Sequence, residues 1–178
     1  MEKDLTHGNT LKLIISFCIP LIGGAIFQQL YNVVDTMIVG RFVGVDALAA
    51  VGSTGNLTNL VVNFYVGLST GASVVIAQYY GAHNKGKIHQ AVHTSYMLAI
   101  VSGIIMMLFG LFFSYQCLDA IGVPHDILND ASLYMRLYFL GMIPGAIYNI
   151  GSGILRAVGD SKRPLYYLII CSIVNVVF

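Results

Sequence analysis

The sequence predicts an all-α fold, namely a polytopic membrane helix bundle with four complete transmembrane helices and a truncated fifth. Of the 178 residues, 57% are hydrophobic and only 10% are charged, whereas a soluble domain carries about 25% charged residues. The mean hydropathy is +0.78, and uncharged runs of spanning length recur from one end of the sequence to the other. A net charge of +1 without a basic tract argues against a nucleic-acid partner.

The first predicted span covers residues 11–40. Its helix would be about 45 Å long against a hydrocarbon core of about 30 Å, so the helix must tilt or bend. Pro20 is the expected helix bend, because a proline removes one backbone hydrogen bond and clashes with the preceding turn. Asp35 lies near the end of this span, after an uncharged run from Leu13 to Val34.

Further predicted spans follow along the chain. A lead-in segment at 51–55 is expected before the second span, because the uncharged stretch 47–84 is too long for one crossing. The fourth span is interrupted at Gly141, and the last predicted span is shorter than the roughly 17 residues that a crossing needs. These later spans are 56–80, 94–118, 132–155 and the incomplete 165–178.

The distribution of Lys and Arg orients the spans. Most of these residues fall on the N-terminal side of the predicted membrane, and only Arg41 and Arg136 fall on the other. Those on the N-terminal side are Lys3, Lys12, Lys85, Lys87, Arg156, Lys162 and Arg163. The positive-inside rule therefore predicts an integral protein of the cytoplasmic (plasma) membrane with its N-terminus in the cytoplasm.

The first span carries a polar stripe that ends at Asp35. At 100° per helical residue, Gln28, Tyr31, Asn32 and Asp35 fall within an arc of about 100°. Such a stripe should face other helices or a water-filled cavity, because an ionised side chain at membrane depth costs about 2.5–3.5 kcal/mol. Asp35 is therefore the leading candidate for binding a cation, with Gln28 and Tyr31 lining a cavity. The alternative, an interfacial ion pair with Arg41, is disfavoured because side chains six residues apart lie about 120° from each other on a helix.

A second polar stripe is predicted on the span 56–80. It contains three amides and two small residues within an arc of about 80°: Asn56, Asn59, Asn63, Gly67 and Thr70. Its amides either form hydrogen bonds between helices, worth about 0.6–2 kcal/mol each, or line a cavity, and the pattern leaves both open. On the fourth span, Tyr138 either lines a cavity or packs with its hydroxyl satisfied.

The other reactive side chains indicate neither a metal centre nor an enzyme. His89 and His93 have the i,i+4 spacing of metal ligands, but Lys85 and Lys87 would oppose a cation, so solvated loop histidines are expected. The three cysteines are widely spaced in or beside apolar runs and fit packing positions: Cys18, Cys117 and Cys171. No nucleophile and base pair, phosphate loop or carboxylate pair stands out.

Three segments together resemble the multidrug and toxic compound extrusion (MATE) transporters. They are Gln-Gln-Leu-Tyr-Asn-Val-Val-Asp-Thr-Met-Ile-Val-Gly-Arg at 28–41, Gln-Tyr-Tyr-Gly-Ala at 78–82 and Leu-Arg-Ala-Val-Gly-Asp-Ser-Lys-Arg-Pro at 155–164. The resemblance implies that residues 1–178 are the N-terminal part of the N-lobe of a twelve-helix, two-lobe transporter. It also implies a secondary active antiporter that exports cationic or amphipathic drugs while Na⁺ or H⁺ enters.

The resemblance also assigns roles to single residues. Asp35 matches the first-helix aspartate that the family uses for cation coupling, and Pro20 matches the proline where that helix bends in some members. Asn175 matches the asparagine of an Asn-x-x-x-Asp pattern whose acid would follow Phe178 directly. Together with Asn32 and Asn63, Asn175 is expected to help Asp35 hold the coupling ion, without another cofactor.

The same resemblance implies missing partners and leaves alternatives. The C-terminal lobe is absent from these residues, so the expected partners are that lobe of the same protein, the lipid bilayer and small cationic drugs. One alternative is a lipid-linked oligosaccharide flippase of the same superfamily, which should carry more cationic residues in its cavity than these spans do. Another is a small channel or a membrane subunit that does not itself transport.

Overall fold

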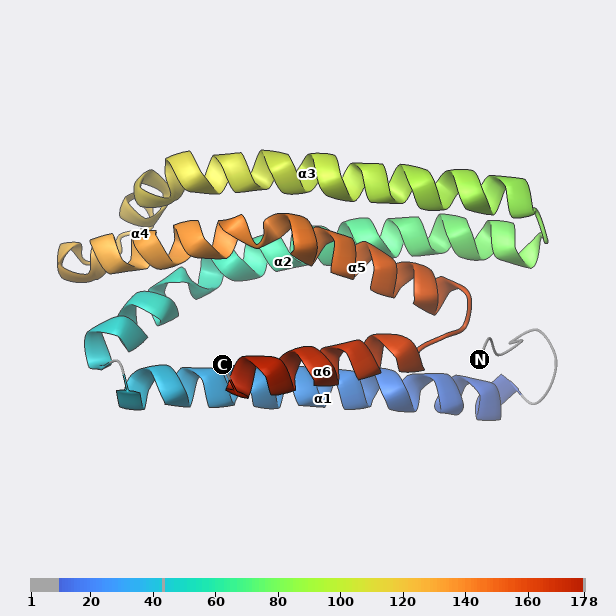
Figure 1. Cartoon of the computed structure of the whole chain (residues 1–178), viewed down its shortest axis with the longest axis horizontal. Coiled ribbons are helices and arrows are strands. Elements are labelled where there is room, and N and C mark those ends of the chain that lie inside the picture. Colours follow the sequence, from blue (N-terminus) through green and yellow to red (C-terminus); the bar gives the residue numbers. More distant parts are fainter. Residues whose placement is uncertain (1–9, 43, 178) are drawn as a thin grey trace.

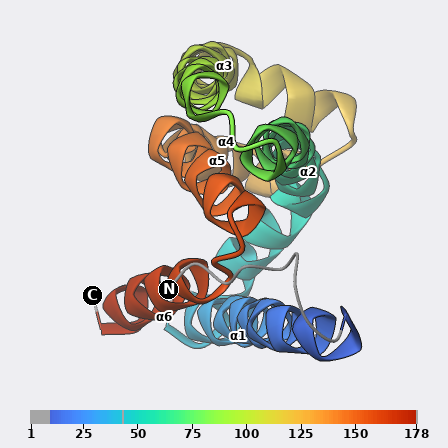
Figure 2. The same ribbon diagram turned by 90° about the vertical axis from the view of Figure 1, so that its right-hand side faces the viewer.

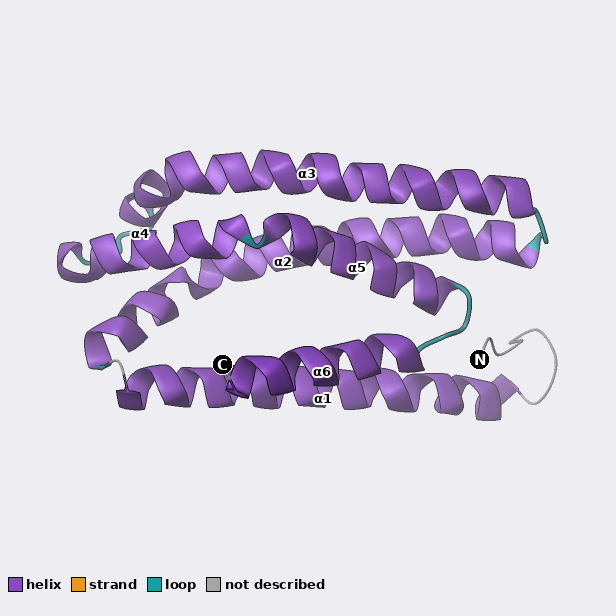
Figure 3. Ribbon diagram, in the orientation of Figure 1, coloured by secondary structure: helices purple, strands orange, loops and turns teal. Residues whose placement is uncertain are grey.

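The computed structural model describes residues 10–42 and 44–177, with the side chains of all but 10, 12, 35 and 175–177. The described residues form six α-helices, listed in chain order as α1 (Thr10–Phe42), α2 (Val45–Gly81), α3 (Lys85–Ala120), α4 (His125–Leu140), α5 (Met142–Ala157) and α6 (Lys162–Val177). Helices and short connections make up all of the described chain (Figure 3), which confirms the predicted all-α class.

The lengths and composition of the helices fit a membrane protein. Helices α1, α2 and α3 are each long and apolar enough to cross a bilayer. Helices α4 and α5 pass the same test only as a pair, bent by 51° at the break between them. The break lies at Gly141, which is the position where the sequence predicts an interruption.

Two helices begin well before the positions that the charge pattern predicts. Helix α2 begins at Val45, so the stretch 51–55 is part of α2 and not a separate lead-in segment. Helix α3 begins at Lys85 because Asn84 caps it, with the Asn84 Oδ1 accepting a hydrogen bond of 3.1 Å from the Lys87 backbone N–H. Charged residues mark membrane depth, whereas a helix continues past that depth until a cap or a turn ends it.

The helices form two groups, which Figures 1 and 2 show from two directions. Helices α2, α3, α4 and α5 pack against one another as a four-helix group, and the buried apolar core lies within this group. Helix α1 lies along α6 and meets the four-helix group only at α2, while α6 meets it only at α5. The chain therefore passes from the α1–α6 pair to a separate packed unit between α1 and α2, and returns to the pair through residues 158–161.

The connection from α5 to α6 is a capped turn. Gly159 has a φ of 83°, a left-handed conformation that favours glycine. The Asp160 side chain is buried and its Oδ1 accepts hydrogen bonds from the backbone N–H groups of Lys162 (3.1 Å) and Arg163 (3.2 Å). Its Oδ2 pairs with the Arg163 Nε at 3.1 Å. Asp160 is thus the cap of α6.

Candidate functional site

The candidate site begins with the polar face of α1, defined as the positions of Gln28, Tyr31, Asn32 and Asp35. Gln28 and Asn32 are exposed within this chain, and Tyr31 is half-buried. The Asp35 side chain lies outside the described side chains, so its position is fixed only by the α1 backbone. All four positions of the face therefore lie on one uninterrupted helix that also contains Pro20. Figure 1 draws this helix as one ribbon. A bend at Pro20 stays a prediction.

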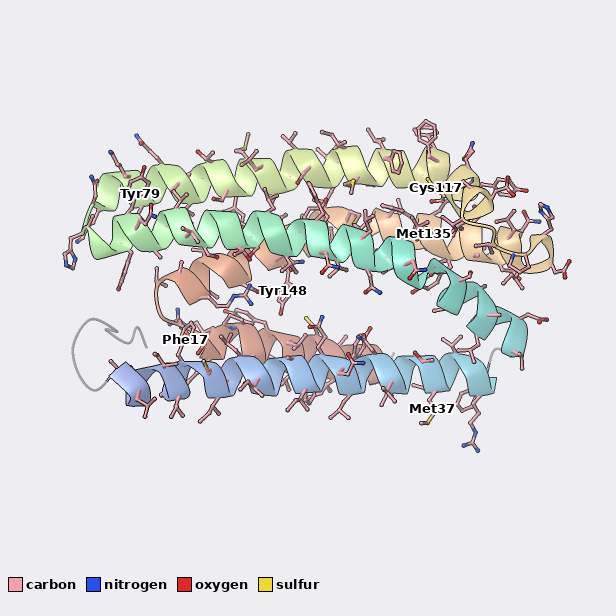
Figure 4. All side chains as sticks on the ribbon, turned by 180° about the vertical axis from the view of Figure 1, so that it is seen from behind. Phe17, Met37, Tyr79, Cys117, Met135 and Tyr148 are labelled. Atoms are coloured by element: carbon pink, nitrogen blue, oxygen red, sulfur yellow. The ribbon has the colours of Figure 1, made fainter. Side chains whose placement is uncertain are left out.

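Helix α6 packs against α1 at Gly24, on the side of α1 that also carries position 35. A Cβ atom at Gly24 would lie 3.7 Å from the Leu165 Cδ1 of α6, so the absence of a side chain at Gly24 lets the two helices approach. Gly24 and position 35 are eleven residues apart, which places them within about 20° of each other around the helix. Figure 4 agrees: Phe17, five turns before position 35, lies on the side toward α6, and Met37 points away.

The register between α1 and α6 brings two predicted positions to the same level. The two helices run in the same direction (Figure 1), and Gly24 is level with Leu165 and Leu168. Position 35 lies eleven residues beyond Gly24, about 16 Å along the helix, and an equal distance along α6 reaches its last turn. That turn contains position 175, although the Asn175 side chain also lies outside the described side chains. The backbone thus places position 175 within about one helical turn of the level of position 35.

The amide stripe of α2 lies opposite the buried face of that helix. The buried positions of α2 include Val61 and Tyr65, and Asn63 lies about 180° around the helix from their midpoint. Asn59 and Asn63 are exposed and form no hydrogen bond to another helix within the described part of the chain. Two open amides on a membrane helix need polar surroundings. The stripe is therefore available to line a cavity or to meet protein beyond these six helices.

Tyr138 lies apart from the polar face of α1. It is half-buried on α4 and packs against the core of the four-helix group, with its ring 6.3 Å from that of Phe139. Helix α4 contacts neither α1 nor α6. The structure therefore brings Gln28, Tyr31 and Asn32 together on α1, and does not bring Tyr138 to them.

A polar contact between α2 and α5 is not evident in the sequence. The Ser69 hydroxyl donates a 2.7 Å hydrogen bond to the Asn149 backbone carbonyl, and the Asn149 amide donates to the Gly145 carbonyl at 2.9 Å. Gly153 lies against Ser69 and Ser73, where a Cβ atom would be 2.7 Å from the Ser73 Oγ. The spacing of Ser69 and Ser73 by one helical turn is a weak signal, because small residues are common in membrane helices.

Metal-ligating side chains do not gather elsewhere in the described residues. The rings of His89 and His93 have centroids 4.4 Å apart on exposed positions of α3. Within the described side chains of residues 10–42 and 44–177, no third His, Cys, Asp or Glu lies beside this pair. The same side chains form no other group of three or more metal-ligating residues.

Comparisons with known proteins agree on one family. The family model "MatE" matches residues 20–178. The probable multidrug resistance protein YoeA of Bacillus subtilis is 33% identical over 160 residues, which are 90% of this chain and 35% of that protein. Crystal structures described as MATE in the straight conformation and in the bent conformation are each 28% identical, with a TM-score of 0.87. The similarity covers 96% of this chain and 38% of each of those chains.

The chain spans about a third of the length of the curated relatives that it matches, such as YoeA. The relatives are multidrug transporters and not enzymes, and the apolar helices make this chain an integral membrane protein. With its match over residues 20–178 and its four-helix group beside the α1–α6 pair, the chain belongs to the MatE family, the MATE transporters.

Proposed function

We propose that the chain is the first part of the N-lobe of a secondary active antiporter that exports cationic or amphipathic drugs in exchange for Na⁺ or H⁺. One observation carries the proposal: positions 35 and 175 lie within about one helical turn of the same level of the α1–α6 pair, and position 35 is on the face of α1 where Gly24 meets α6. A carboxylate and an amide at that level supply the oxygen atoms that a small cation or a proton requires.

The coupling follows from the cost of a buried charge. A carboxylate at position 35 is expensive away from water until a cation or proton neutralises it. Binding therefore favours whichever arrangement of α1 and α6 encloses that position. A tenfold preference between two arrangements needs only about 1.4 kcal/mol of differential affinity. Among the described helices, α1 meets the four-helix group only through α2 and α6 only through α5, so few contacts oppose a change in the arrangement of the pair against that group.

Several features of the sequence and fold support the rest of the proposal. Lys and Arg concentrate on the N-terminal side, which favours a cytoplasmic N-terminus in the plasma membrane. The exposed amides of α2, Asn59 and Asn63, are oriented away from the four-helix core and would line the drug pathway. The remaining helices of the transporter, including its C-terminal lobe, would complete that pathway. No central Lys or Arg stands in the spans, which disfavours a pyrophosphate-carrying flippase substrate.

The first prediction tests Asp35 in the complete protein, reconstituted into vesicles with a fluorescent cationic drug inside. Asp35→Asn keeps the size and polarity of the side chain but removes its charge, so ion-driven efflux should fall by at least about tenfold, the effect of about 1.4 kcal/mol. Separate Na⁺ and H⁺ gradients identify the coupling ion.

The matched control is Asp46→Asn, because Asp46 is an exposed aspartate in the first turn of α2. It should export the drug at the unsubstituted rate. Normal ion-driven efflux by the Asp35 variant would remove this residue from the mechanism. If drug efflux falls equally in both variants, the loss reflects general damage to the protein. That result would also contradict the proposed role of Asp35.

A further inference from the structure

An open groove lies between α2 and α3, away from the α1 and α6 positions of the proposed cation site. Its volume is about 660 Å³, and α5 contributes Ile150 to its floor. Gly67, Gly71 and Tyr79 line it from α2, and Lys87 and Gln90 line it from α3. No residue of α1 or α6 lines it. The groove is therefore separate from the polar face of α1.

The shape of the groove comes from two glycines. A Cβ atom at Gly67 or Gly71 would meet no other atom within 4 Å, so a larger residue there would project into open space. From Gly67 to Tyr79 is twelve helical residues, about 18 Å. One leaflet of a bilayer has a hydrocarbon depth of about 15 Å, half of the whole core. The groove is therefore about as long as one acyl chain in one leaflet.

The two ends of the groove differ in chemistry. Along Gly67 and Gly71 the lining is largely apolar, whereas Lys87 and Gln90 stand at the end next to the α2–α3 turn. The Lys87 Nζ lies over the Tyr79 ring, 5.5 Å from its centroid, so its charge is held at the mouth of the groove. This arrangement matches an amphipathic molecule whose tail points toward the middle of the membrane.

The charge of the surrounding helices selects the sign of the head group. Residues 47–118 contain no Asp or Glu, so α3 up to residue 118 and almost all of α2 lack a carboxylate. Lys85 and Lys87 are the charged residues of this stretch, and His83, His89 and His93 flank them. A basic site between transmembrane helices at membrane-surface depth is typical of sites for anionic lipid head groups.

We propose that this groove binds one anionic phospholipid as a resident lipid. One acyl chain lies between α2 and α3 over Gly67 and Gly71, and the lipid phosphate lies at Lys87, with Gln90 as a hydrogen-bond donor. The lipid covers apolar groove surface that would otherwise remain unpacked, and it joins α2 to α3 along the half of their length near the turn. This role is independent of the exported substrate and of the coupling ion.

The test measures lipid binding to the complete protein, purified and delipidated in detergent, by native mass spectrometry. Phosphatidylglycerol and phosphatidylcholine with identical acyl chains are titrated in parallel, and phosphatidylglycerol should bind more tightly. Lys87→Gln should weaken phosphatidylglycerol binding by about fivefold, the effect of one cation near an anionic lipid. Lys85→Gln removes the same charge from an exposed position that does not line the groove, so it should weaken binding less.

A second pair of variants tests the acyl-chain site. Gly71→Leu fills the groove and should reduce the binding of both lipids, whereas Gly52→Leu makes the same change on α2 where a Cβ atom meets open space outside the groove. Any one of three results would overturn the proposal. The protein could bind the two lipids with equal affinity, or Lys87→Gln and Lys85→Gln could weaken phosphatidylglycerol binding equally. The third result is undiminished lipid binding by Gly71→Leu. A complete protein whose own helices fill the groove and exclude both lipids would also overturn it. If Gly71→Leu does not fold, the two lysine variants decide alone.

Discussion

At the scale of single residues, the sequence shows polar groups better than it shows close contacts. Asp35 and the amides of α1 stand out because each is costly in an apolar run. Gly153 does not stand out, yet it is the point where α5 lies directly on Ser69 and Ser73 of α2. The sequence does not distinguish a glycine that faces lipid from one that contacts a neighbouring backbone. The contact depends on which helices pair, and the residues around Gly153 in the sequence do not determine that pairing.

The contact at Gly153 leads to the second prediction. Gly153→Ala would place a Cβ atom 3.0 Å from the Ser69 carbonyl oxygen, which is backbone and cannot move aside without shifting α2. Overpacking of this kind typically costs about 1–3 kcal/mol of folding free energy. The chain has no tryptophan, so thermal unfolding in detergent is followed by circular dichroism.

Gly145→Ala is the control for this change, since Gly145 is on the same helix and a Cβ atom there would meet nothing within 4 Å. It should unfold at the same temperature as the unsubstituted chain or slightly higher, because alanine favours a helix over glycine. If both variants unfold alike, α5 is not held against α2 at Gly153.

At the scale of helices, the hydropathy pattern predicts which segments are helical but not where each helix ends. The 51° break at Gly141 is predicted because a glycine and a following proline interrupt an apolar run. The early starts of α2 and α3 are not predicted, because charged and polar residues outside the membrane core still favour a helix. The start of α3 depends on capping by Asn84, and α2 begins directly after Gly44, which has a φ of 121°.

The break between α4 and α5 is held by two glycines of α3, and this leads to the third prediction. Gly110 lies against the Phe139 ring before the break, and a Cβ atom at Gly103 would lie 3.1 Å from the Ile143 Cα after it. Gly110→Ala overlaps the ring close to its attachment to the backbone, so it should destabilise the fold by about 1–3 kcal/mol. The measurement is the unfolding temperature in detergent.

The control is Gly52→Ala on α2, where a Cβ atom meets open space. This variant should not lose stability. A Gly110 variant as stable as the Gly52 variant would show that Phe139 repacks freely and that α3 does not fix the bent pair.

At the scale of the whole molecule, the predicted bundle proves to be two units. The buried core belongs to α2, α3, α4 and α5, and α1 lies with α6, its most distant helix in the sequence. The sequence predicts helices with polar stripes but does not state that the first pairs with the last, because a stripe shows that a partner is needed and not which one. The resemblance to MATE transporters supplies the expectation that Asp35 and Asn175 act together, and the helix register gives it a physical basis.

The fourth prediction tests this pairing by disulfide formation in a chain whose native cysteines, Cys18, Cys117 and Cys171, are replaced by serine. Gly24→Cys together with Leu165→Cys should cross-link under mild oxidation, since a Cβ atom at Gly24 lies 3.7 Å from Leu165. The control pair is Ile22→Cys with Leu165→Cys, because Ile22 is exposed and about 160° around α1 from Gly24. Non-reducing electrophoresis separates the two outcomes. Equal cross-linking in both pairs would contradict the observed face of α1.

The pairing of α1 with α6 also sets an order of events during synthesis. Helix α1 ends at Phe42 and α6 begins at Lys162, so about 120 residues must be translated before α1 meets its partner. At about 5–20 residues per second, the ribosome needs roughly 6–24 s for them. During this interval α1 has left the ribosome without its partner helix. A nascent chain of this length is therefore the state in which membrane insertion machinery or quality control would first encounter α1 unpaired.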